Sequence, residues 1–143
     1  TEIYTLSLHD ALPISLVIPG GFGAAKNLSS YAFDGAKCTV NSHVAAAIKA
    51  MHAAGKPIGA LCIAPVILAK VLGNVTLTIG QDPTTADNLA AMGAKHQPTL
   101  HGEIVVDQQN KIVTTPCYML NSRVDQIADG ADHLIQAMMA MMA

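Results

Sequence analysis

A cysteine near the middle of the chain has the neighbours that a nucleophile on a sharp strand-to-helix turn requires. Cys62 follows an apolar run at residues 58–61 and precedes a helix-start signal at Pro65. Such a turn needs small residues two places before and two places after the nucleophile, and Ala60 and Ala64 fill these places. A thiol at a helix start faces unpaired N–H groups and the positive end of the helix dipole, which favour the thiolate. Cys62 is therefore the predicted catalytic nucleophile.

The chain has three cysteines, with no C-x-x-C pair and no disulfide-framework spacing. This pattern favours a reducing compartment, and we expect a cytoplasmic protein. An intracellular cysteine can also be a small buried hydrophobic residue and nothing more. We favour that interpretation for Cys38 and Cys117, whereas the turn spacing favours a functional role for Cys62.

A glycine loop follows an earlier apolar run. The run at residues 16–18 passes into Gly-Gly-Phe-Gly at 20–23. A helical pattern over 39–54 separates it from the run at 58–61, and this order predicts two parallel strands with a crossover helix. Loops after parallel strands share the carboxyl edge of the sheet, where open α/β sheets bind ligands. We therefore expect the glycine loop to lie beside Cys62.

The glycine loop fits no nucleotide-binding motif. As a P-loop it lacks a glycine before Lys26 and has Asn27 in place of Ser/Thr, and as a dinucleotide fingerprint it has Lys26 where Gly or Ala is needed. A tight turn with positive φ is the simplest explanation. We prefer a further role, in which Gly20 and Gly21 face the substrate and the N–H groups of Gly21 and Ile63 form an oxyanion hole.

None of the six histidines is adjacent to the elbow cysteine. The patterns place His43, His52 and His133 in helices, and His96 and His101 near a hairpin from which they could reach a site. No Cys, His and carboxylate cluster has ligand spacing, so we do not expect a metal site.

Composition limits the kinds of partner. Hydrophobic residues make up 51% of the chain and charged residues 13%, where about 25% charged is usual. Much of the surface is therefore expected to be buried, in a sheet covered on both faces or in a subunit contact. The net charge is −2 and no Lys/Arg cluster occurs, which argues against nucleic-acid and anionic membrane partners. No segment is apolar for long enough to span a bilayer.

The order of elements predicts an α/β domain with a mostly parallel sheet. Residues 24–37 are expected to form a loop with a short helix. The other expected elements are helices at 64–72, 83–92 and 121–142 and strands at 75–79, 104–106 and 111–114, with a hairpin turn at 107–110. The closing helix is expected to bury a stripe of Val124, Ile127, Ala131, Leu134 and Met138.

The first 15 residues, TEIYTLSLHDALPIS, resemble a translated sequencing adapter rather than a native segment. A native strand is the alternative, since Ile3, Leu6 and Leu8 loosely suit one. We prefer a non-native segment at 1–15 and assign the domain to residues 16–143.

Five strings, in order along the chain, carry a resemblance to a known family. They are LVIPGGFGAAKNL at 16–28, KPIGALCIAP at 56–65, LTIG at 77–80, MGAKH at 92–96 and NKIVTTPCYM at 110–119. Together they resemble the ElbB family of isoprenoid-biosynthesis glyoxalases, within the ThiJ/PfpI, class I glutamine amidotransferase-like superfamily. The resemblance implies a flavodoxin-like three-layer sandwich that forms a homodimer in intact members, and that here lacks its N-terminal βα units.

The same resemblance implies glutathione-independent glyoxalase activity on small dicarbonyls such as glyoxal, without a cofactor. It places Cys62 at the family's elbow cysteine, Gly21 at its oxyanion glycine and Ile63 at the second N–H donor.

Three departures from the superfamily's pattern limit what the resemblance implies. The late His-x-Glu of the amidotransferases is absent around residues 115–121, and Ile63 replaces the histidine of the peptidase-like relatives. The superfamily's carboxylate lies on a loop that residues 1–15 replace, so we expect the glyoxalase activity of this chain to be impaired. The alternative is a redox-sensing or regulatory protein that uses the same cysteine.

Overall fold

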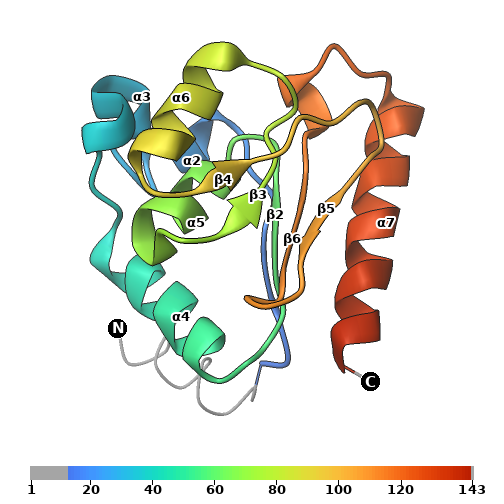
Figure 1. Ribbon diagram of the computed structural model, residues 1–143, viewed down its shortest axis with the longest axis horizontal. Coiled ribbons are helices and arrows are strands. Elements are labelled where there is room, and N and C mark those ends of the chain that lie inside the picture. The colour runs from blue at the N-terminus through green and yellow to red at the C-terminus, as the bar shows by residue number, and fades with distance from the viewer. Residues whose placement is uncertain (1–12, 143) are drawn as a thin grey trace.

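Four strands form the central sheet, in the order β1-β2-β6-β5 (Figure 1). β1 (Leu16–Ile18), β2 (Ile58–Leu61) and β6 (Ile112–Thr115) are parallel, and β5 (Val105–Asp107) runs antiparallel to β6. The computed structural model describes residues 13–142, so most of the segment that we interpret as non-native lies outside the described residues. The predicted α/β class with a mostly parallel sheet is confirmed.

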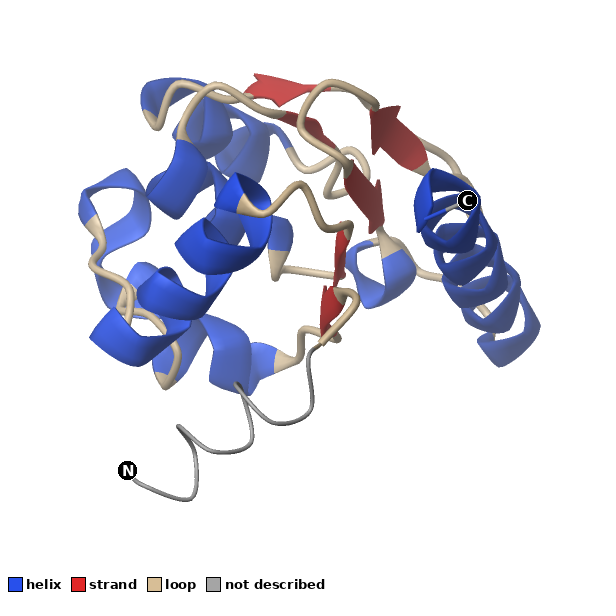
Figure 2. Cartoon of the chain, turned by 90° about the horizontal axis from the view of Figure 1, so that it is seen from below, coloured by secondary structure: helices blue, strands red, loops and turns tan. Residues whose placement is uncertain are grey.

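Helices cover both faces of this sheet, which makes three layers (Figures 1 and 2). On one face lie α4 (Ser42–Ala53) and α5 (Pro65–Leu72), and on the other lies α7 (Val124–Met142). All of β2 is buried between them, as expected for a central parallel strand. α4 begins later than predicted because the Asn41 side chain accepts hydrogen bonds from the first turn and caps the helix there.

Two glycines let α7 approach the sheet closely. An added Cβ on Gly59 of β2 would lie 2.5 Å from Met138 Sδ, and one on Gly130 of α7 would lie 2.7 Å from Thr115 Oγ1. Leu134 and Met138 are buried as predicted. Val124 is 74% exposed, so its predicted place in the buried stripe is wrong. It lies only about 40° around the helix from the buried Met138, so its place as the first residue of α7, rather than its side of the helix, distinguishes it from the buried residues.

The strand predicted at 75–79 is shorter than expected. Only β3 (Thr76–Leu77) is regular, and it pairs with β4 (Lys95–His96) in a separate two-stranded sheet. The Thr78 N–H donates to the Thr114 side-chain hydroxyl at 2.9 Å rather than to a strand carbonyl, and Gly80 turns the chain with a φ of 98°. These two features end the strand early.

The connections hold more helix than predicted. In place of one short helix within 24–37, the structure has α2 (Phe22–Lys26), α3 (Tyr31–Asp34) and the 3₁₀ helix η1 (Gly35–Lys37), and the 3₁₀ helix η2 (Cys117–Met119) is a further addition. The helix predicted at 83–92 is present as α6 (Pro83–Ala91). The predicted hairpin turn is present between β5 and β6, where the Asp107 carboxylate accepts hydrogen bonds from Asn110 N at 3.0 Å and Asn110 Nδ2 at 2.9 Å.

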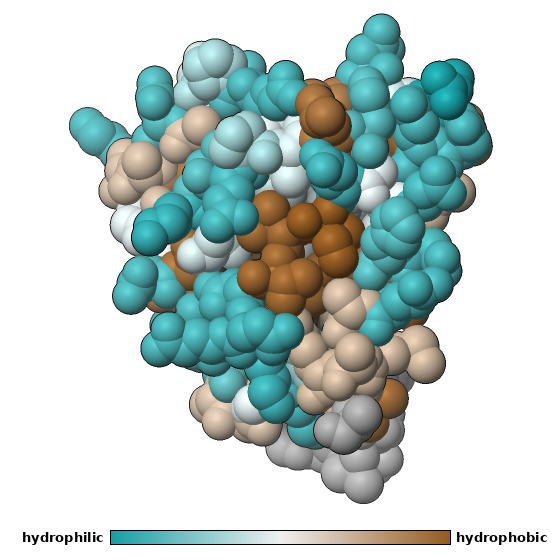
Figure 3. Space-filling view, turned by 45° about the vertical axis from the view of Figure 1, so that its right-hand side comes forward, coloured by the Kyte–Doolittle hydropathy of each residue, from teal (hydrophilic) through white to brown (hydrophobic). Residues whose placement is uncertain are grey.

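Apolar side chains also reach the surface. Figure 3 shows an apolar patch in the middle of one face, bordered by polar residues. Phe22, Phe33 and Met139 are each more than 60% exposed. Within residues 13–142 no helix is both long and apolar enough to cross a membrane. The predicted homodimer stays a prediction.

Candidate functional site

Cys62 lies on the turn between β2 and α5, as the spacing predicts. Its φ is 62°, a left-handed conformation that costs a residue other than glycine about 1–2 kcal/mol. The Cys62 N–H donates to Thr115 O at 3.0 Å and the Ala64 N–H donates to Leu61 O at 3.0 Å, so the turn is held on both sides. Strained backbone of this kind persists only where the surrounding fold maintains it, and it is found most often at functional sites.

The glycine loop touches this turn directly. Gly20 has a φ of 92°, and a Cβ added there would lie 2.5 Å from Leu61 O and 2.9 Å from Cys62 Cβ. Only glycine permits this approach, because both the conformation and the space exclude a side chain. The two loops therefore meet at the carboxyl edge of the sheet, as predicted.

Two backbone donors at this junction are unpaired. Among residues 13–142, neither the Gly21 N–H nor the Ile63 N–H donates a hydrogen bond, whereas Cys62 and Ala64 use theirs. Gly21 has a φ of 82°, and nothing lies within 4 Å of a Cβ added to it, so it faces open space. Unpaired N–H groups beside a nucleophile are what an oxyanion hole requires. Their role in catalysis stays a prediction.

A second thiol lies next to the elbow. Thr115 is the register partner of Leu61, and Cys117 follows it after one residue. Cys117 is 8% exposed, so the predicted burial is correct, but its proximity to Cys62 was not predicted. Burial raises the pKa of the Cys117 thiol, the neighbouring Cys62 raises it further, and a hydrogen bond from the Cys62 backbone N–H lowers it.

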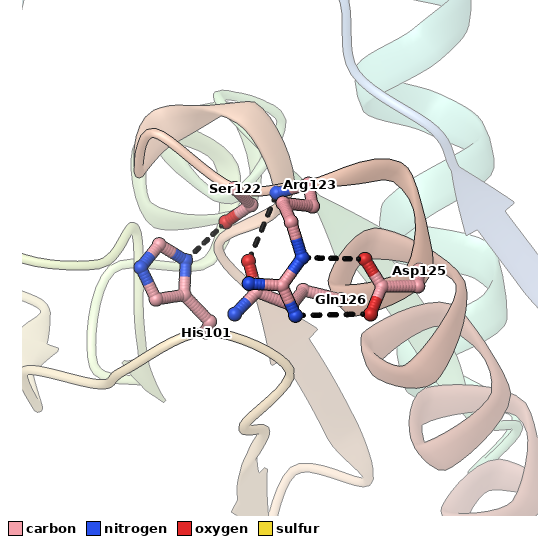
Figure 4. Close-up of polar contacts among 5 residues, drawn as sticks. All are labelled: His101, Ser122, Arg123, Asp125 and Gln126. Atoms are coloured by element: carbon pink, nitrogen blue, oxygen red, sulfur yellow. Dashed lines mark hydrogen bonds and ion pairs between the residues drawn. The ribbon is translucent and has the colours of Figure 1, made fainter.

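The sequence left open whether His96 and His101 reach the site. His101 Nδ1 is 2.5 Å from Ser122 Oγ (Figure 4), and Ser122 Oγ donates to Cys117 O at 3.2 Å. This chain of bonds ends on the backbone of the second cysteine. His96 lies in β4, where burial lowers its pKa, and its Nε2 is buried without a partner among the described residues.

The start of α7 is fixed by its own polar contacts. Arg123 pairs with Asp125 at 3.0 Å, and the Arg123 N–H donates to Gln126 Oε1 at 2.9 Å (Figure 4). Both charged groups are exposed, so this pair contributes little to stability. In the part of the chain that the structure describes, no three His, Cys, Asp or Glu side chains gather closely enough to hold a metal ion.

Known proteins are similar in sequence to this chain over most of its length. The chain is 43% identical to the Homo sapiens glutamine amidotransferase-like class 1 domain-containing protein 3, mitochondrial, over 99% of the chain and 55% of the relative. It is 42% identical to the Rattus norvegicus ES1 protein homolog, mitochondrial, over 93% of the chain and 52% of the relative. Its homologues are glutamine amidotransferase-like class 1 domain proteins. The chain spans about half the length of these curated relatives, and it matches no family model.

Solved structures agree with this homology. A structure from Ehrlichia chaffeensis, described as an isoprenoid biosynthesis protein with an amidotransferase-like domain, superposes with a TM-score of 0.84 at 31% identity. It is matched over 93% of this chain and 61% of that chain. Drosophila melanogaster DJ-1beta shares the fold at 20% identity, with a TM-score of 0.55 over 89% of this chain and 60% of its own. The predicted ThiJ/PfpI, glutamine amidotransferase-like superfamily and its flavodoxin-like fold fit these relatives.

The names of the amidotransferase-like relatives bear on one further prediction. Both the human and the rat protein are named as mitochondrial, whereas we expected a cytoplasmic protein. The location of the present chain stays a prediction. The finer placement in the ElbB family rests on the five strings of sequence.

Proposed function

We propose that the protein carries the cysteine site of a glyoxalase that converts small dicarbonyls such as glyoxal to hydroxy acids. The observation that supports this most is the strained elbow, where Cys62 sits at a φ of 62° against the close-packed Gly20. The unpaired N–H groups of Gly21 and Ile63 supply donors for an alkoxide that develops when a thiolate attacks a carbonyl. The isoprenoid-biosynthesis label of the Ehrlichia relative is consistent with the ElbB resemblance.

The proposed reaction needs no external redox partner. The Cys62 thiolate adds to one aldehyde carbon of glyoxal, and the oxygen takes a proton to give a hemithioacetal. The carbon bound to sulfur then loses the proton on carbon and the proton on its hydroxyl, while the neighbouring carbon and its carbonyl oxygen each gain one proton, which leaves a thioester of glycolate on Cys62. Water attacks the thioester, glycolate leaves and the thiol is regenerated. One carbon is oxidised and the other is reduced within the same molecule.

The proton transfer between carbons is the step that the described residues support least. Within residues 13–142, the Cys62 thiol has no hydrogen bond to a carboxylate or an imidazole. A general base contributes about 10²–10⁴-fold to such a step. We therefore propose that this chain turns over glyoxal slowly.

Glycolate release from glyoxal tests the proposal. Wild type is expected to form glycolate above the rate of the Cys62→Ser variant by more than about 100-fold, because the nucleophile is removed. Cys38→Ser is the matched control, since Cys38 is a buried thiol that the site does not contain. Equal glycolate formation by wild type and Cys62→Ser would refute the covalent mechanism. Fast turnover by wild type would refute the claim that turnover is limited because no carboxylate or imidazole among residues 13–142 is hydrogen-bonded to the Cys62 thiol.

A redox-sensing or regulatory protein is the second candidate. Cys62 is partly exposed while Cys38 and Cys117 are buried, so Cys62 is the thiol that a dissolved oxidant meets first. Intact mass after mild peroxide treatment separates the two candidates. A sensor is expected to be oxidised selectively through Cys62 and to release no glycolate from glyoxal.

A further inference from the structure

The carboxyl edge of the sheet holds two strained cysteines side by side. Among the described residues, three besides glycine have positive φ, and two of them are Cys62 at 62° and Cys117 at 46°. Each stands just beyond the end of its strand, and the strands β2 and β6 are direct neighbours. Neither the proposed lyase chemistry nor the packing of the core explains a left-handed cysteine at the second position.

The strand register limits how far apart these two residues are. Leu61 pairs with Thr115, and the Cys62 N–H continues the ladder to Thr115 O at 3.0 Å. Cys62 lies one residue beyond this pair and Cys117 two residues beyond it, and the Cys62 backbone N–H is near enough to the Cys117 thiol to form a hydrogen bond with it. Both side chains also pack in one apolar cluster, with Leu61 and Val113. A disulfide typically joins Cα atoms about 4.4–6.8 Å apart, and we expect a shift of the two turns to bring the cysteines to that separation.

We propose that Cys62 and Cys117 form a reversible intramolecular disulfide, in which Cys117 resolves an oxidised Cys62. Both thiols are free in the structure. The proposal concerns the same nucleophile as the glyoxalase but does not depend on turnover of a dicarbonyl.

The chemistry requires a hydroperoxide as the oxidant. The Cys62 thiolate attacks one peroxide oxygen, so that the S–O bond forms and the O–O bond breaks, and the departing oxygen takes a proton to leave as water or an alcohol. The Cys117 thiol then loses its proton and attacks the Cys62 sulfur. The S–S bond forms, the S–O bond breaks, and the departing hydroxide takes up a proton as water. Both sulfurs are oxidised by one equivalent each and the peroxide is reduced.

The two cysteines differ in solvent exposure, and this gives them different roles in the proposed reaction. Cys62 is partly open to solvent, whereas Cys117 is 8% exposed. Burial raises the pKa of Cys117, so its thiol stays protonated and unreactive toward dissolved peroxide. Cys117 becomes useful only when the sulfur beside it carries a leaving group. A disulfide would then protect Cys62 from further oxidation to the irreversible sulfinic acid.

Peptide mapping tests this directly, because each cysteine falls in a different tryptic peptide. Cys62 lies in residues 50–70, Cys117 in 112–123 and Cys38 in 38–49. The reduced wild-type protein is treated with one equivalent of hydrogen peroxide, alkylated and digested without reductant. We expect a linked pair of the 50–70 and 112–123 peptides, a monomeric band on a non-reducing gel, and loss of both after dithiothreitol.

The variants add an independent readout. With at least two equivalents of hydrogen peroxide, Cys117→Ala is expected to raise the fraction of Cys62 found as sulfinic acid by at least about five-fold, because nothing resolves the sulfenic acid before a second peroxide oxidises it. Cys38→Ala, at another buried thiol, is expected to behave as wild type. Absence of the linked peptides from the wild type would overturn the proposal even if a variant fails to fold. Linked peptides found only in a dimer band, or equal sulfinic acid with and without Cys117, would also overturn it. Glyoxal is absent throughout, so either proposal can fail alone.

Discussion

Replacing Gly20 with alanine tests whether the glycine loop must touch the elbow. The alanine Cβ would lie 2.5 Å from Leu61 O and 2.9 Å from Cys62 Cβ. Both atoms belong to the strained turn and cannot rotate away as the tip of a flexible side chain would. The residue would also have to adopt a φ of 92°. The fold therefore has no inexpensive way to accommodate this methyl group.

The expected cost has two parts. A left-handed conformation costs an alanine about 1–2 kcal/mol, and forced overlap in a packed region costs about 1–3 kcal/mol. Gly20→Ala should therefore lower the free energy of unfolding by about 2–5 kcal/mol. Gly21→Ala is the matched control, since its φ is 82° but nothing lies within 4 Å of the new Cβ. It should lose only the conformational part, about 1–2 kcal/mol.

Urea denaturation followed by far-UV circular dichroism measures both variants. The alkylation rate of Cys62 by iodoacetamide gives a second readout, because displacement of the loop from the turn should change access to the thiol. Gly20→Ala is expected to change this rate and Gly21→Ala to leave it near the wild-type value. If the two variants are equally stable and equally reactive, the contact between the loops does not constrain the site.

Two further predictions concern the supports of the site. Gly59→Ala should lower the free energy of unfolding by about 1–3 kcal/mol in the same urea assay, because its Cβ would lie 2.5 Å from Met138 Sδ beneath α7; an unchanged midpoint would contradict the close packing. Burial alone would raise the pKa of Asp107, but hydrogen bonds from Thr76 and Asn110 outweigh it and hold the pKa below its ordinary value. The resulting stability is present above the unfolded pKa of about 3.9 and is lost as the pH falls further. The free energy of unfolding of Asp107→Ala should therefore be about 1–3 kcal/mol below that of wild type at pH 7, and this difference should narrow below about pH 4. A difference in stability that does not depend on pH would refute this.

The parts of the fold that follow from local pattern were predictable from the sequence. The strands of β1 and β2, the crossover helix and the turn at Cys62 each have their own apolar run, cap or small-residue spacing. The hairpin before β6 is marked by polar turn residues. Local pattern did not find β4, because two residues of Lys95–His96 carry no periodicity.

The site was only partly predictable, for a different reason. The elbow and the glycine loop could be paired because parallel strands end at one edge of a sheet. The approach of Cys117 could not, because it depends on the register between β2 and β6, which are separated by some fifty residues of chain. A shift of that register by one residue would turn the side chains of β6 to the opposite face. Nothing near Cys117 in the sequence reports which register is adopted.

The two glycine contacts of α7 have a consequence for how the protein would respond to damage at its C-terminal end. Gly59 lies three residues before Cys62, and Thr115, which faces Gly130, lies two residues before Cys117. These two contacts fix the position of α7 along the sheet. A slip of the helix by one turn, about 5.4 Å, would break both of them. We therefore expect proteolysis or fraying of α7 to change the distance between the sulfurs of Cys62 and Cys117 before the sheet itself opens.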